Sequence, residues 1–219
     1  MQRSDSLLLG ALLSFSGGLQ DAYTFNVRDM VFANAQTGNV VLMSQNLMLG
    51  NWQKGIDYLS PIIAFVGGVF LAEFIEGKFK HNKSVHWRQL VIFCEILLLF
   101  LVGFLSQDHN RMANMAVSFA CAMQVQAFRM VRGVKYASTM CIGNLRSGTS
   151  HLSRFFRTKN RKDLIDATLY FGVILVFAIG AGIGGVLSEY LGIRTIWVSC
   201  VFLSVAGLYM IKNMEADKG

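Results

Sequence analysis

Two short polar segments interrupt a sequence that is otherwise strongly apolar. The first reads FANAQTGN and runs from Phe32 to Asn39; the second reads ASTMCIGN and runs from Ala137 to Asn144, at an offset of 105 residues. Lipid tolerates polar, irregular backbone only where that backbone is buried in protein or lines a cavity. Paired interruptions in two halves of a chain are the sequence feature that best indicates a binding site in a transport protein. We therefore interpret the two segments as a candidate site for a small polar or ionic solute.

The residue types inside these segments suit such a site. Gly38 and Gly143 can adopt backbone angles closed to other residues, so each is expected to let a helix break or turn back. Thr37, Asn39 and Asn144 carry donors and acceptors for freed backbone groups or for a substrate. The alternative interpretation is that Thr-Gly-Asn only caps a helix end, and the double occurrence favours a site. The predicted pathway residues are Asp21, Asn34, Thr37, Gly38, Asn39, Glu95, Gln126, Gly143 and Asn144.

Ionisable residues within apolar runs are the next candidates. A charge at the bilayer centre costs about 2.5–3.5 kcal/mol on insertion scales, so such groups usually face the bundle interior and mark function. Asp21 is the strongest candidate to exchange a proton or hold a cation; its alternative is a pair with Arg28 or a helix cap. Glu95 is a second candidate, with an interhelical hydrogen bond as its alternative. Glu73 lies near the end of its span, where it can pair with a neighbouring lysine.

Two glutamines occupy one apolar run with different expected roles. Gln126 stands 105 residues after Asp21, so we interpret it as a pathway residue. Gln124 is interpreted as a packing contact, because a carboxamide between membrane helices more often joins helices than lines a channel.

The composition points to an integral membrane protein. The chain has 219 residues, of which 53% are hydrophobic and 15% charged, against about 25% charged in a typical soluble domain. Longer polar stretches that could form a soluble domain are missing, so we expect a single membrane domain over 1–219. The net charge of +7 comes from basic residues in loops between apolar runs, which argues against nucleic-acid binding.

The sequence offers no catalytic centre. Cys94, Cys121, Cys141 and Cys200 form no CxxC or Cys/His cluster, so no metal site or disulfide framework is expected. The histidines are read as loop residues without a nucleophile beside them, and there is no phosphate-binding glycine loop. We expect a protein that is not an enzyme and uses no cofactor.

Six segments are apolar and long enough to cross a bilayer core of about 30 Å as helices. They are 7–26, 57–77, 89–106, 112–130, 164–188 and 193–212. The interruption segments, 31–50 and 137–153, either dip in and return, giving six spans, or cross, giving eight. Cytoplasmic loops carry excess Lys and Arg. Six spans with both termini inside place 16 of the 20 basic residues on the inner side, whereas eight spans divide them 11 to 9. We predict six spans and cytoplasmic termini, with eight as the alternative.

Three spans per half make the second half upside down relative to the first. The predicted fold is an all-α integral membrane protein of about six transmembrane helices and two broken or re-entrant segments, built as inverted repeats over 7–106 and 112–212. At an offset of 105, Gly38-Asn39 meets Gly143-Asn144 and Gly67 meets Gly172. Residues 1–18 have the features of a signal peptide, but the repeat begins inside them, so we expect no cleavage.

Small residues at helical spacing predict close helix packing, with a permeation groove or the dimer face of a homo-oligomer as the alternatives. These stripes are Gly10, Ser14 and Gly18; Ala64, Gly68 and Ala72; and Gly180 and Gly184.

The basic stretch 146–162 has phenylalanines between its six Arg and Lys residues. It is interpreted as a topology signal or as an amphipathic helix that meets anionic lipid.

The segments Gly17-Gly18-Leu19-Gln20-Asp21-Ala22-Tyr23 and Phe32 to Val41 resemble the YoaK family, small bacterial membrane proteins that carry a domain of unknown function, DUF1275. The family's second T-G-N-like element reads Ile142-Gly143-Asn144 here, so its Thr is lost. The resemblance implies a multi-span protein of the bacterial cytoplasmic membrane, described as permease-like. We expect a small permease or channel-like transporter; the alternative is a non-transporting membrane assembly or lipid-interacting protein.

Overall fold

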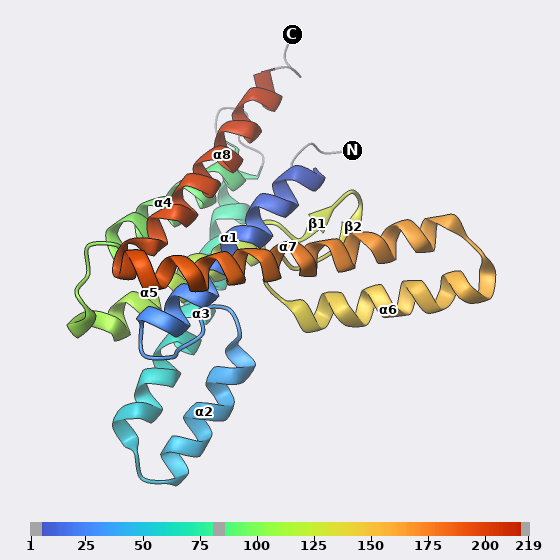
Figure 1. Cartoon of the computed structure of the whole chain (residues 1–219). Coiled ribbons are helices and arrows are strands. Elements are labelled where there is room, and N and C mark those ends of the chain that lie inside the picture. The colour runs from blue at the N-terminus through green and yellow to red at the C-terminus, as the bar shows by residue number, and fades with distance from the viewer. Residues whose placement is uncertain (1–5, 81–85, 216–219) are drawn as a thin grey trace.

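The computed structural model describes residues 6–80 and 86–215, with side chains to residue 211, and the fold there is all-α with one small hairpin (Figure 1). The helices are α1 (Leu7–Val27), α2 (Gln36–Met48), α3 (Trp52–Phe79), α4 (Trp87–Val102), α5 (Asn110–Ala127), α6 (Cys141–Thr158), α7 (Arg161–Leu191) and α8 (Ile196–Glu215). Short 3-10 turns, η2 (Gln107–His109) and η3 (Gly192–Thr195), precede α5 and α8. Strands β1 (Met130–Val131) and β2 (Val134–Lys135) pair antiparallel.

Each of the six predicted spans coincides with a helix, namely α1, α3, α4, α5, α7 or α8. Among the described residues, two helical stretches are long and apolar enough to cross a membrane: Trp52–Phe79, and Arg161–Ile211, in which α7, η3 and α8 run on from one another. The full number of crossings stays a prediction. The predicted inner-side residues Arg3, Lys83 and Lys218, and the side chain of Lys212, lie outside the described residues.

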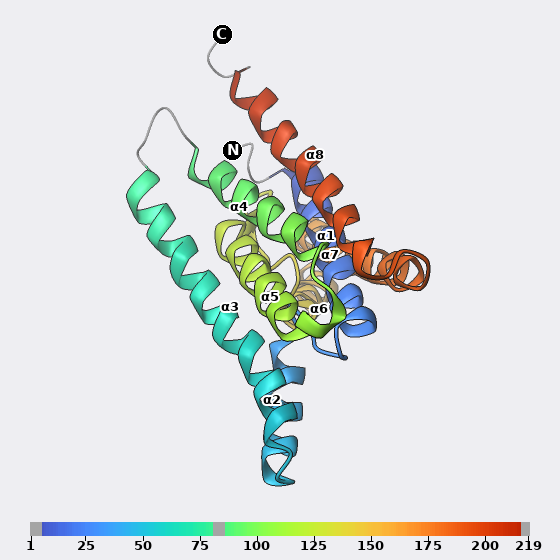
Figure 2. The same ribbon diagram turned by 90° about the vertical axis from the view of Figure 1, so that its left-hand side faces the viewer.

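The helices pack in matching pairs across the molecule. Helix α1 packs along α7, and α3 packs along α5 (Figures 1 and 2). Helix α4 contacts α5 and α8, and α8 also contacts α1. If the chain is divided before α5, the first helix of each half therefore packs on the third helix of the other half.

Glycines bring these paired helices into direct contact. A Cβ on Gly18 would overlap the backbone oxygen of Phe177 in α7, and a Cβ on Gly180 would overlap that of Phe15 in α1. Gly68 of α3 meets the backbone oxygen of Phe119 in α5 in the same way. Close helix packing by the small-residue stripes is thus confirmed at these positions, as expected where lipid gives no hydrophobic drive to association.

The two interruptions form a short irregular segment followed by a helix. Helix α2 folds back along the start of α3, and α6 folds back along the start of α7 (Figure 1). Both hairpins project from the bundle, and the fourth residue of α2 and of α6 is buried in it, Asn39 at 0% and Asn144 at 3% exposure. Helix α6 continues to residue 158, so His151 is helical and not a loop residue.

The expected role of Gly38 and Gly143 as backbone breakpoints is wrong. Both lie in the first turn of a helix, and neither has a positive φ. The positive φ angles fall earlier, at Asp29 and Met30 after α1 and at Gly133 between β1 and β2. The chain therefore turns before each polar segment, which then enters the bundle as an irregular segment with a bend at its centre.

Arg28 closes the α1 end of the bundle from the inside. Its side chain is fully buried, and Nε donates to the Tyr23 hydroxyl at 2.8 Å. The remaining donors bind Asn110 Oδ1 and the backbone oxygens of Val102, Leu105 and Ser106 at 2.8–3.2 Å. Val102 is the last residue of α4, whose end carries the negative pole of the helix dipole, and the other two oxygens follow it in the chain.

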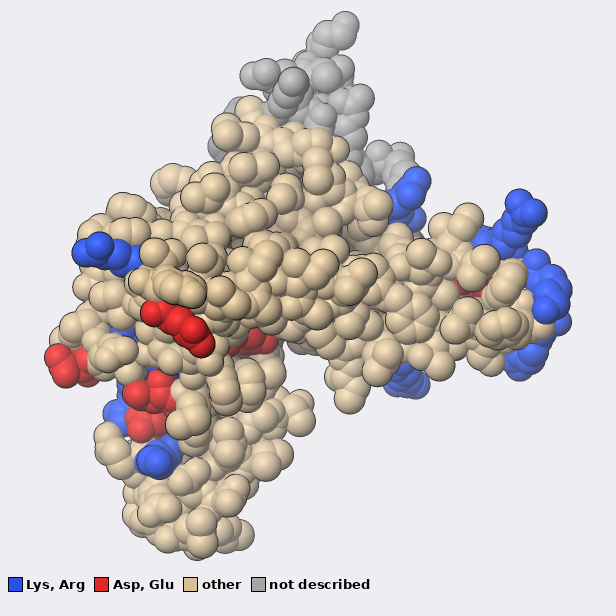
Figure 3. Space-filling view, in the orientation of Figure 1, with Lys and Arg blue, Asp and Glu red and all other residues tan. Residues whose placement is uncertain are grey.

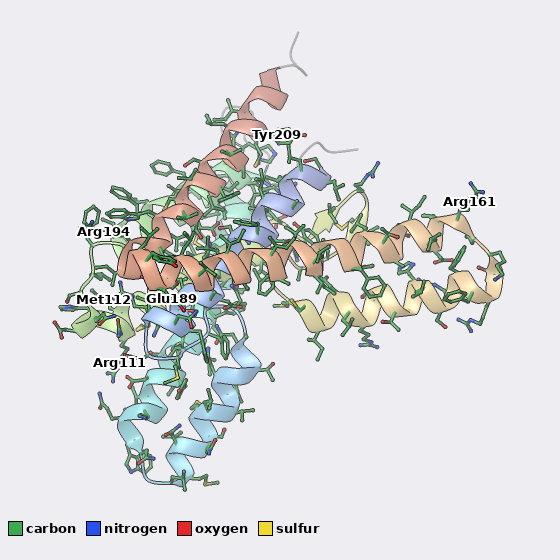
Figure 4. The ribbon with its side chains drawn as sticks, in the orientation of Figure 1. Arg111, Met112, Arg161, Glu189, Arg194 and Tyr209 are labelled. Carbon is green, nitrogen blue, oxygen red and sulfur yellow. The ribbon has the colours of Figure 1, made fainter. Side chains whose placement is uncertain are left out.

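Charged side chains gather at opposite ends of the molecule in the view of Figure 3. Lys and Arg cover the far end of the α6–α7 hairpin, which carries Arg154, Arg157, Lys159, Arg161 and Lys162. Asp and Glu on this face gather near the other end of α7, where Glu189 lies (Figures 3 and 4).

Candidate functional site

The two asparagines of the polar segments make the same pair of hydrogen bonds. Asn39 Nδ2 donates to the backbone oxygen of Phe32 at 2.7 Å, and Asn39 Oδ1 accepts from the Phe32 N–H at 3.1 Å. Asn144 Nδ2 donates to the backbone oxygen of Ala137 at 2.7 Å, and its Oδ1 accepts from the Ala137 N–H at 3.3 Å. Each carboxamide fixes the entering chain against the start of the helix that follows it.

A small network ties the first segment to α5. Asn39 Nδ2 also donates to Gln36 Oε1 at 2.9 Å, and Gln36 Nε2 donates to the backbone oxygen of Ala33 at 2.8 Å. Ser118 of α5 donates to the same oxygen at 2.8 Å. Neither helix start has a side-chain bond from its N-cap residue. Asn39 instead satisfies the preceding chain from inside the first turn of α2, and this arrangement, called the cap below, lies in the interface between the halves.

Asp21 holds the first segment from α1. Its Oδ1 accepts the backbone N–H of Asn34 at 2.7 Å, just before α2, and its side chain is 8% exposed. Thr24, one turn later, accepts from the Ala33 N–H at 3.1 Å. The alternative pairing of Asp21 with Arg28 is wrong, since the Arg28 guanidinium is occupied by other groups. The carboxylate instead occupies the electropositive start of α2.

The two polar segments meet beside Gly17. Asn34 Nδ2 lies 3.4 Å from the backbone oxygen of Gly17, and a Cβ on Gly17 would overlap the methyl group of Thr139. Asn34 and Thr139 occupy equivalent positions at the offset of 105. Gln124 joins the second segment to the bundle by donating to Ser138 Oγ at 2.9 Å. Each interruption therefore contacts α1 at Gly17, and a shared site between them stays a prediction.

Buried oxygens around this meeting point have spare acceptor capacity. Asn34 Oδ1, Gln124 Oε1 and Thr139 Oγ1 are buried without a hydrogen-bond partner within the described chain. Buried polar atoms are otherwise almost always satisfied, so each unpaired group calls for an explanation. The cluster of Asp21, Asn34, Gln124 and Thr139, called the central cluster below, can accept a proton, a water molecule or a cation.

Glu95 connects to the central cluster through two residues that sequence reasoning missed. Its side chain is 0% exposed, and Oε1 lies 3.4 Å from Gln20 Nε2. Gln20 Oε1 in turn accepts from the Cys121 thiol, which lies within electrostatic reach of both Asp21 and Glu95. Glu95 Oε2 is buried and unpaired within the described chain. Glu95, Gln20 and Cys121 thus form a hydrogen-bonded chain inside the bundle.

A cavity of about 600 Å³ lies on the other side of the second polar segment. Its walls come from the end of α3, the start of α4, the end of α5, the β hairpin and the start of α6. It contains three of the predicted residues, Gln126, Gly143 and Asn144. The stretch 137–140 separates it from the central cluster, because Ala137 and Met140 line the cavity whereas Ser138 and Thr139 are buried toward the cluster.

The predicted site residues therefore fall into separate groups. Asp21, Asn34 and Glu95 belong to the buried polar core, and Asn39 is a cap beside it. Gln126 lies at the cavity and donates to Glu73 Oε1, away from Asp21. Thr37 is exposed on the first turn of α2 and joins neither group.

One missed residue had a detectable signal. Thr139 stands opposite Asn34 at the offset of 105, so extending the repeat comparison backward from Gly143-Asn144 would have found it. Gln20 and Cys121 have no such signal, because each sits in an apolar helix whose partner is set by tertiary packing. Among the described residues, no group of three or more His, Cys, Asp or Glu side chains could hold a metal ion.

Comparison with known proteins identifies a family and a relative. The profile of a family described as a protein of unknown function (DUF1275) matches residues 9–209. The chain is similar to the UPF0700 transmembrane protein YoaK of Bacillus subtilis (strain 168), with 24% identity over 214 residues that cover 94% of this chain and 93% of the relative. No solved structure matches.

Proposed function

Because the chain belongs to the DUF1275 family, and its relative is named a transmembrane protein, we propose that this membrane protein is a small permease for a polar or ionic solute. The observation that carries the proposal is the meeting of Asn34 and Thr139 beside Gly17, which joins two interruptions from different parts of the chain. Irregular polar backbone at such a place suits a solute pathway.

The proposed topology has six spans in one membrane domain, with halves 7–106 and 112–212 inverted relative to each other. The matched pairing of α1 with α7 and of α3 with α5 supports two equivalent halves. The charge distribution supports opposite faces for the two hairpins. Arg161 marks the far end of the basic α6–α7 hairpin, whereas Arg111, Glu189 and Arg194 lie at the other side of the molecule (Figure 4). The basic end is then cytoplasmic, in the inner membrane of a bacterium.

The proposed pathway has one open half and one closed half. The cavity beside Gly143 leads from the predicted cytoplasmic side to the stretch 137–140. At the equivalent place in the first half, Phe32 stands where the second half has Ala137, and a Cβ on Gly38 would lie 3.2 Å from the Phe32 ring. Phe32 stacks on Phe25 with ring centroids 4.9 Å apart. This arrangement fits an inward-open state with an aromatic outer gate.

In this proposal, the acidic groups couple the movement of the solute to the exchange of a proton or cation. Asp21 binds the start of α2, and Glu95 reaches the same region through Gln20 and Cys121. A proton or cation that exchanges at Asp21 would change the charge held at the start of α2 and so the position of that segment. We propose that these acids serve transport and not catalysis.

Uptake by membrane vesicles tests this function. Vesicles from cells that express the full chain are assayed with a panel of labelled succinate, phosphate, glutamate, choline and sodium. A flux that depends on the protein is expected, with Asp21→Asn and Asn39→Ala reducing it about tenfold or more. Asp57→Asn is the control, because Asp57 forms an exposed ion pair with Arg111 away from the central cluster. Equal flux in all variants would contradict the assignment of Asp21 and Asn39 to the pathway. The absence of flux with every probe would contradict the permease itself.

A lipid-interacting role is the second candidate, because the α6–α7 hairpin end combines charge with aromatic surface. Lys159 Nζ lies 5.9 and 5.8 Å from the ring centroids of Phe155 and Phe156. Basic and aromatic residues together suit anionic headgroups, and residues 146–162 are their proposed contact. Neutralising Arg154, Arg157, Arg161 and Lys162 would then abolish a cellular phenotype that Asn39→Ala preserves. In this second proposal, the protein also assembles as a homo-oligomer in the membrane.

A further inference from the structure

The cavity beside α6 is lined by an excess of positive charge. Arg88, Arg129 and Lys135 contribute to its walls, and Glu76 is the acidic residue among the lining side chains. Glu76 also binds Lys80 at 2.9 Å and Arg129 at 3.3 Å, and Arg129 lies 3.7 Å from Glu73 as well. These two acids and two bases balance one another, so the excess of positive charge comes from Arg88 and Lys135. The electrostatic potential of the cavity therefore favours an anion.

The start of α6 adds to this preference. Gly143, in the first turn of this 18-residue helix, lines the cavity, and a Cβ there would meet nothing within 4 Å. The first N–H groups of a helix lack partners within the helix and carry the positive end of its dipole. Together with three basic side chains, they form a surface that can bind a carboxylate or phosphate group.

The first half of the chain shows what such a helix start binds. There the carboxylate of Asp21 accepts the backbone N–H of Asn34 immediately before α2. The equivalent position in the second half is Gln126, which is neutral and donates to Glu73. The second half therefore keeps the same cap, on Asn144, but has no carboxylate of its own at the position of Asp21.

The second half also has the room for a ligand. Phe32 covers Gly38 in the first half, whereas Ala137 occupies the position of Phe32 in the second and leaves Gly143 open. A cavity of about 600 Å³ is large enough for a small organic molecule. Apolar walls from Trp87, Val125 and Met130 complement the charged ones.

We propose that this cavity binds a small soluble organic anion, whose carboxylate or phosphate group meets Arg129, Lys135 and the start of α6. The anion then lies beside Gln126, which stands at the position of Asp21 and lines the cavity. This inference deepens the proposed function, because it names the substrate class of the same pathway and the side from which it enters. A phospholipid headgroup offers the same chemistry, so the test must separate the two sources.

Binding to the full chain in detergent micelles tests the proposal without any flux. Trp87 lines the cavity, so its fluorescence reports occupancy when Trp52 and Trp197 are replaced by Phe. Succinate and inorganic phosphate are titrated at constant ionic strength, with choline chloride as the reference salt. Saturable quenching by succinate or phosphate is expected. Arg129→Gln and Lys135→Gln should each weaken it about tenfold, the loss of one charged hydrogen bond.

Arg132→Gln is the matched control, because Arg132 lies in the same β hairpin but lines a different pocket, beside α7. It should leave the affinity unchanged. Ala137→Phe copies the aromatic residue of the first half and should fill the cavity and abolish quenching. Thermal unfolding of each variant in the absence of ligand verifies folding, and a variant that does not fold is replaced by Ser147→Phe, at another lining residue.

Equal affinities for Arg129→Gln, Lys135→Gln and Arg132→Gln would overturn the site. Quenching by dihexanoyl phosphatidylglycerol, but by neither succinate nor phosphate, would overturn the soluble anion in favour of a lipid headgroup. The proposed function fails separately: if succinate binds in micelles but vesicles move none of the probes, the anion site stands and the permease is contradicted.

Discussion

Asn39 and Asn144 stand 105 residues apart and hold their segments by the same two hydrogen bonds, each to the backbone of the residue seven positions earlier. Two such matches are hard to attribute to apolar composition, because they require a carboxamide and an irregular entering segment at the same spacing. The cap is therefore a structural element that both halves share, whatever has changed around it.

The Asn39 cap should stabilise the protein more than the side-chain hydrogen bond of Asn46, near the other end of α2, does. Asn39→Ala leaves the buried N–H and carbonyl of Phe32 without a partner, which should cost about 1–3 kcal/mol. Asn46→Ala removes a bond to the Leu42 carbonyl within the same helix, near the projecting hairpin end, and should cost well under 1 kcal/mol. Thermal unfolding in detergent measures both. Equal effects of the two substitutions would mean that the cap adds no stability of its own.

Helix contact through glycine gives a second matched pair, both in α7. Gly180→Ala places a methyl group against the backbone of Phe15, so α1 and α7 must separate at a cost of about 1–3 kcal/mol. Gly182→Ala meets nothing within 4 Å and should be neutral or stabilising by up to about 1 kcal/mol, the helix-propensity difference. Unfolding temperatures that fall for Gly180→Ala and hold for Gly182→Ala are the expected result; the reverse order would contradict the observed helix contact.

Arg28 should not tolerate lysine. Its guanidinium uses all five N–H donors, with Tyr23 and Asn110 as the side-chain partners, and lysine cannot reproduce that planar fork. Each unmet charged hydrogen bond costs about 1.5–3 kcal/mol, so Arg28→Lys should sharply reduce the yield of folded protein. Arg111→Lys, at an exposed ion pair with Asp57, should cost at most about 1 kcal/mol. Size-exclusion chromatography of both variants distinguishes these cases.

Sequence pattern and structure agree where apolar length decides. The helices α1, α3, α5 and α7 begin and end within about five residues of the predicted spans, because a long apolar run has no stable alternative to a helix in lipid. The repeated Gly-Asn also led to the meeting point of the two interruptions.

The positions of the turns and the surroundings of single polar side chains depend on tertiary contacts, so the sequence did not predict them. Gly38 and Gly143 look like breakpoints, yet the turns lie before them, at Asp29 and Met30 in the first half. Gln124 and Gln126 differ by two positions in α5 and so face different ways: Gln124 enters the central cluster, whereas Gln126 lies at the cavity. Periodicity separates the two faces of a helix but does not say which face meets the other half.

The α6–α7 hairpin has a pH-dependent contact at its basic end. The pKa of Asp163 lies below its ordinary value of 3.8, because of hydrogen bonds from His151 and Arg154 and the charge of Arg154. A depressed carboxyl pKa contributes stability above the unfolded value, and this stability is lost as the pH falls through the folded value. The difference in melting temperature between the parent protein and Asp163→Asn should be constant from about pH 8 to 5 and disappear below 3.8. A difference that already vanishes between pH 7 and 5 would assign the contact to another group.

The position of Phe32 predicts that a reagent reaches the two polar segments differently from the two sides of the membrane. In a background in which Cys94, Cys121, Cys141 and Cys200 are replaced, a cysteine at Gly143 should react with a membrane-impermeant maleimide from the cytoplasmic side, because that position lines the open cavity. A cysteine at Gly38 should be protected, because the Phe32 ring covers it.

Combining Gly38→Cys with Phe32→Ala removes that ring, and with it the stack on Phe25. Labelling from the outer side should then rise about tenfold, the change expected when roughly 1.4 kcal/mol of a closed state is lost. Trp52→Cys is the reference, since Trp52 is 68% exposed at the end of the α2–α3 hairpin and should react from outside whether or not Phe32 is present. Unchanged protection of Gly38→Cys after Phe32→Ala would show that the outer side is closed by helix packing and not by this aromatic pair. Reaction of Trp52→Cys from the cytoplasmic side would invert the whole topology.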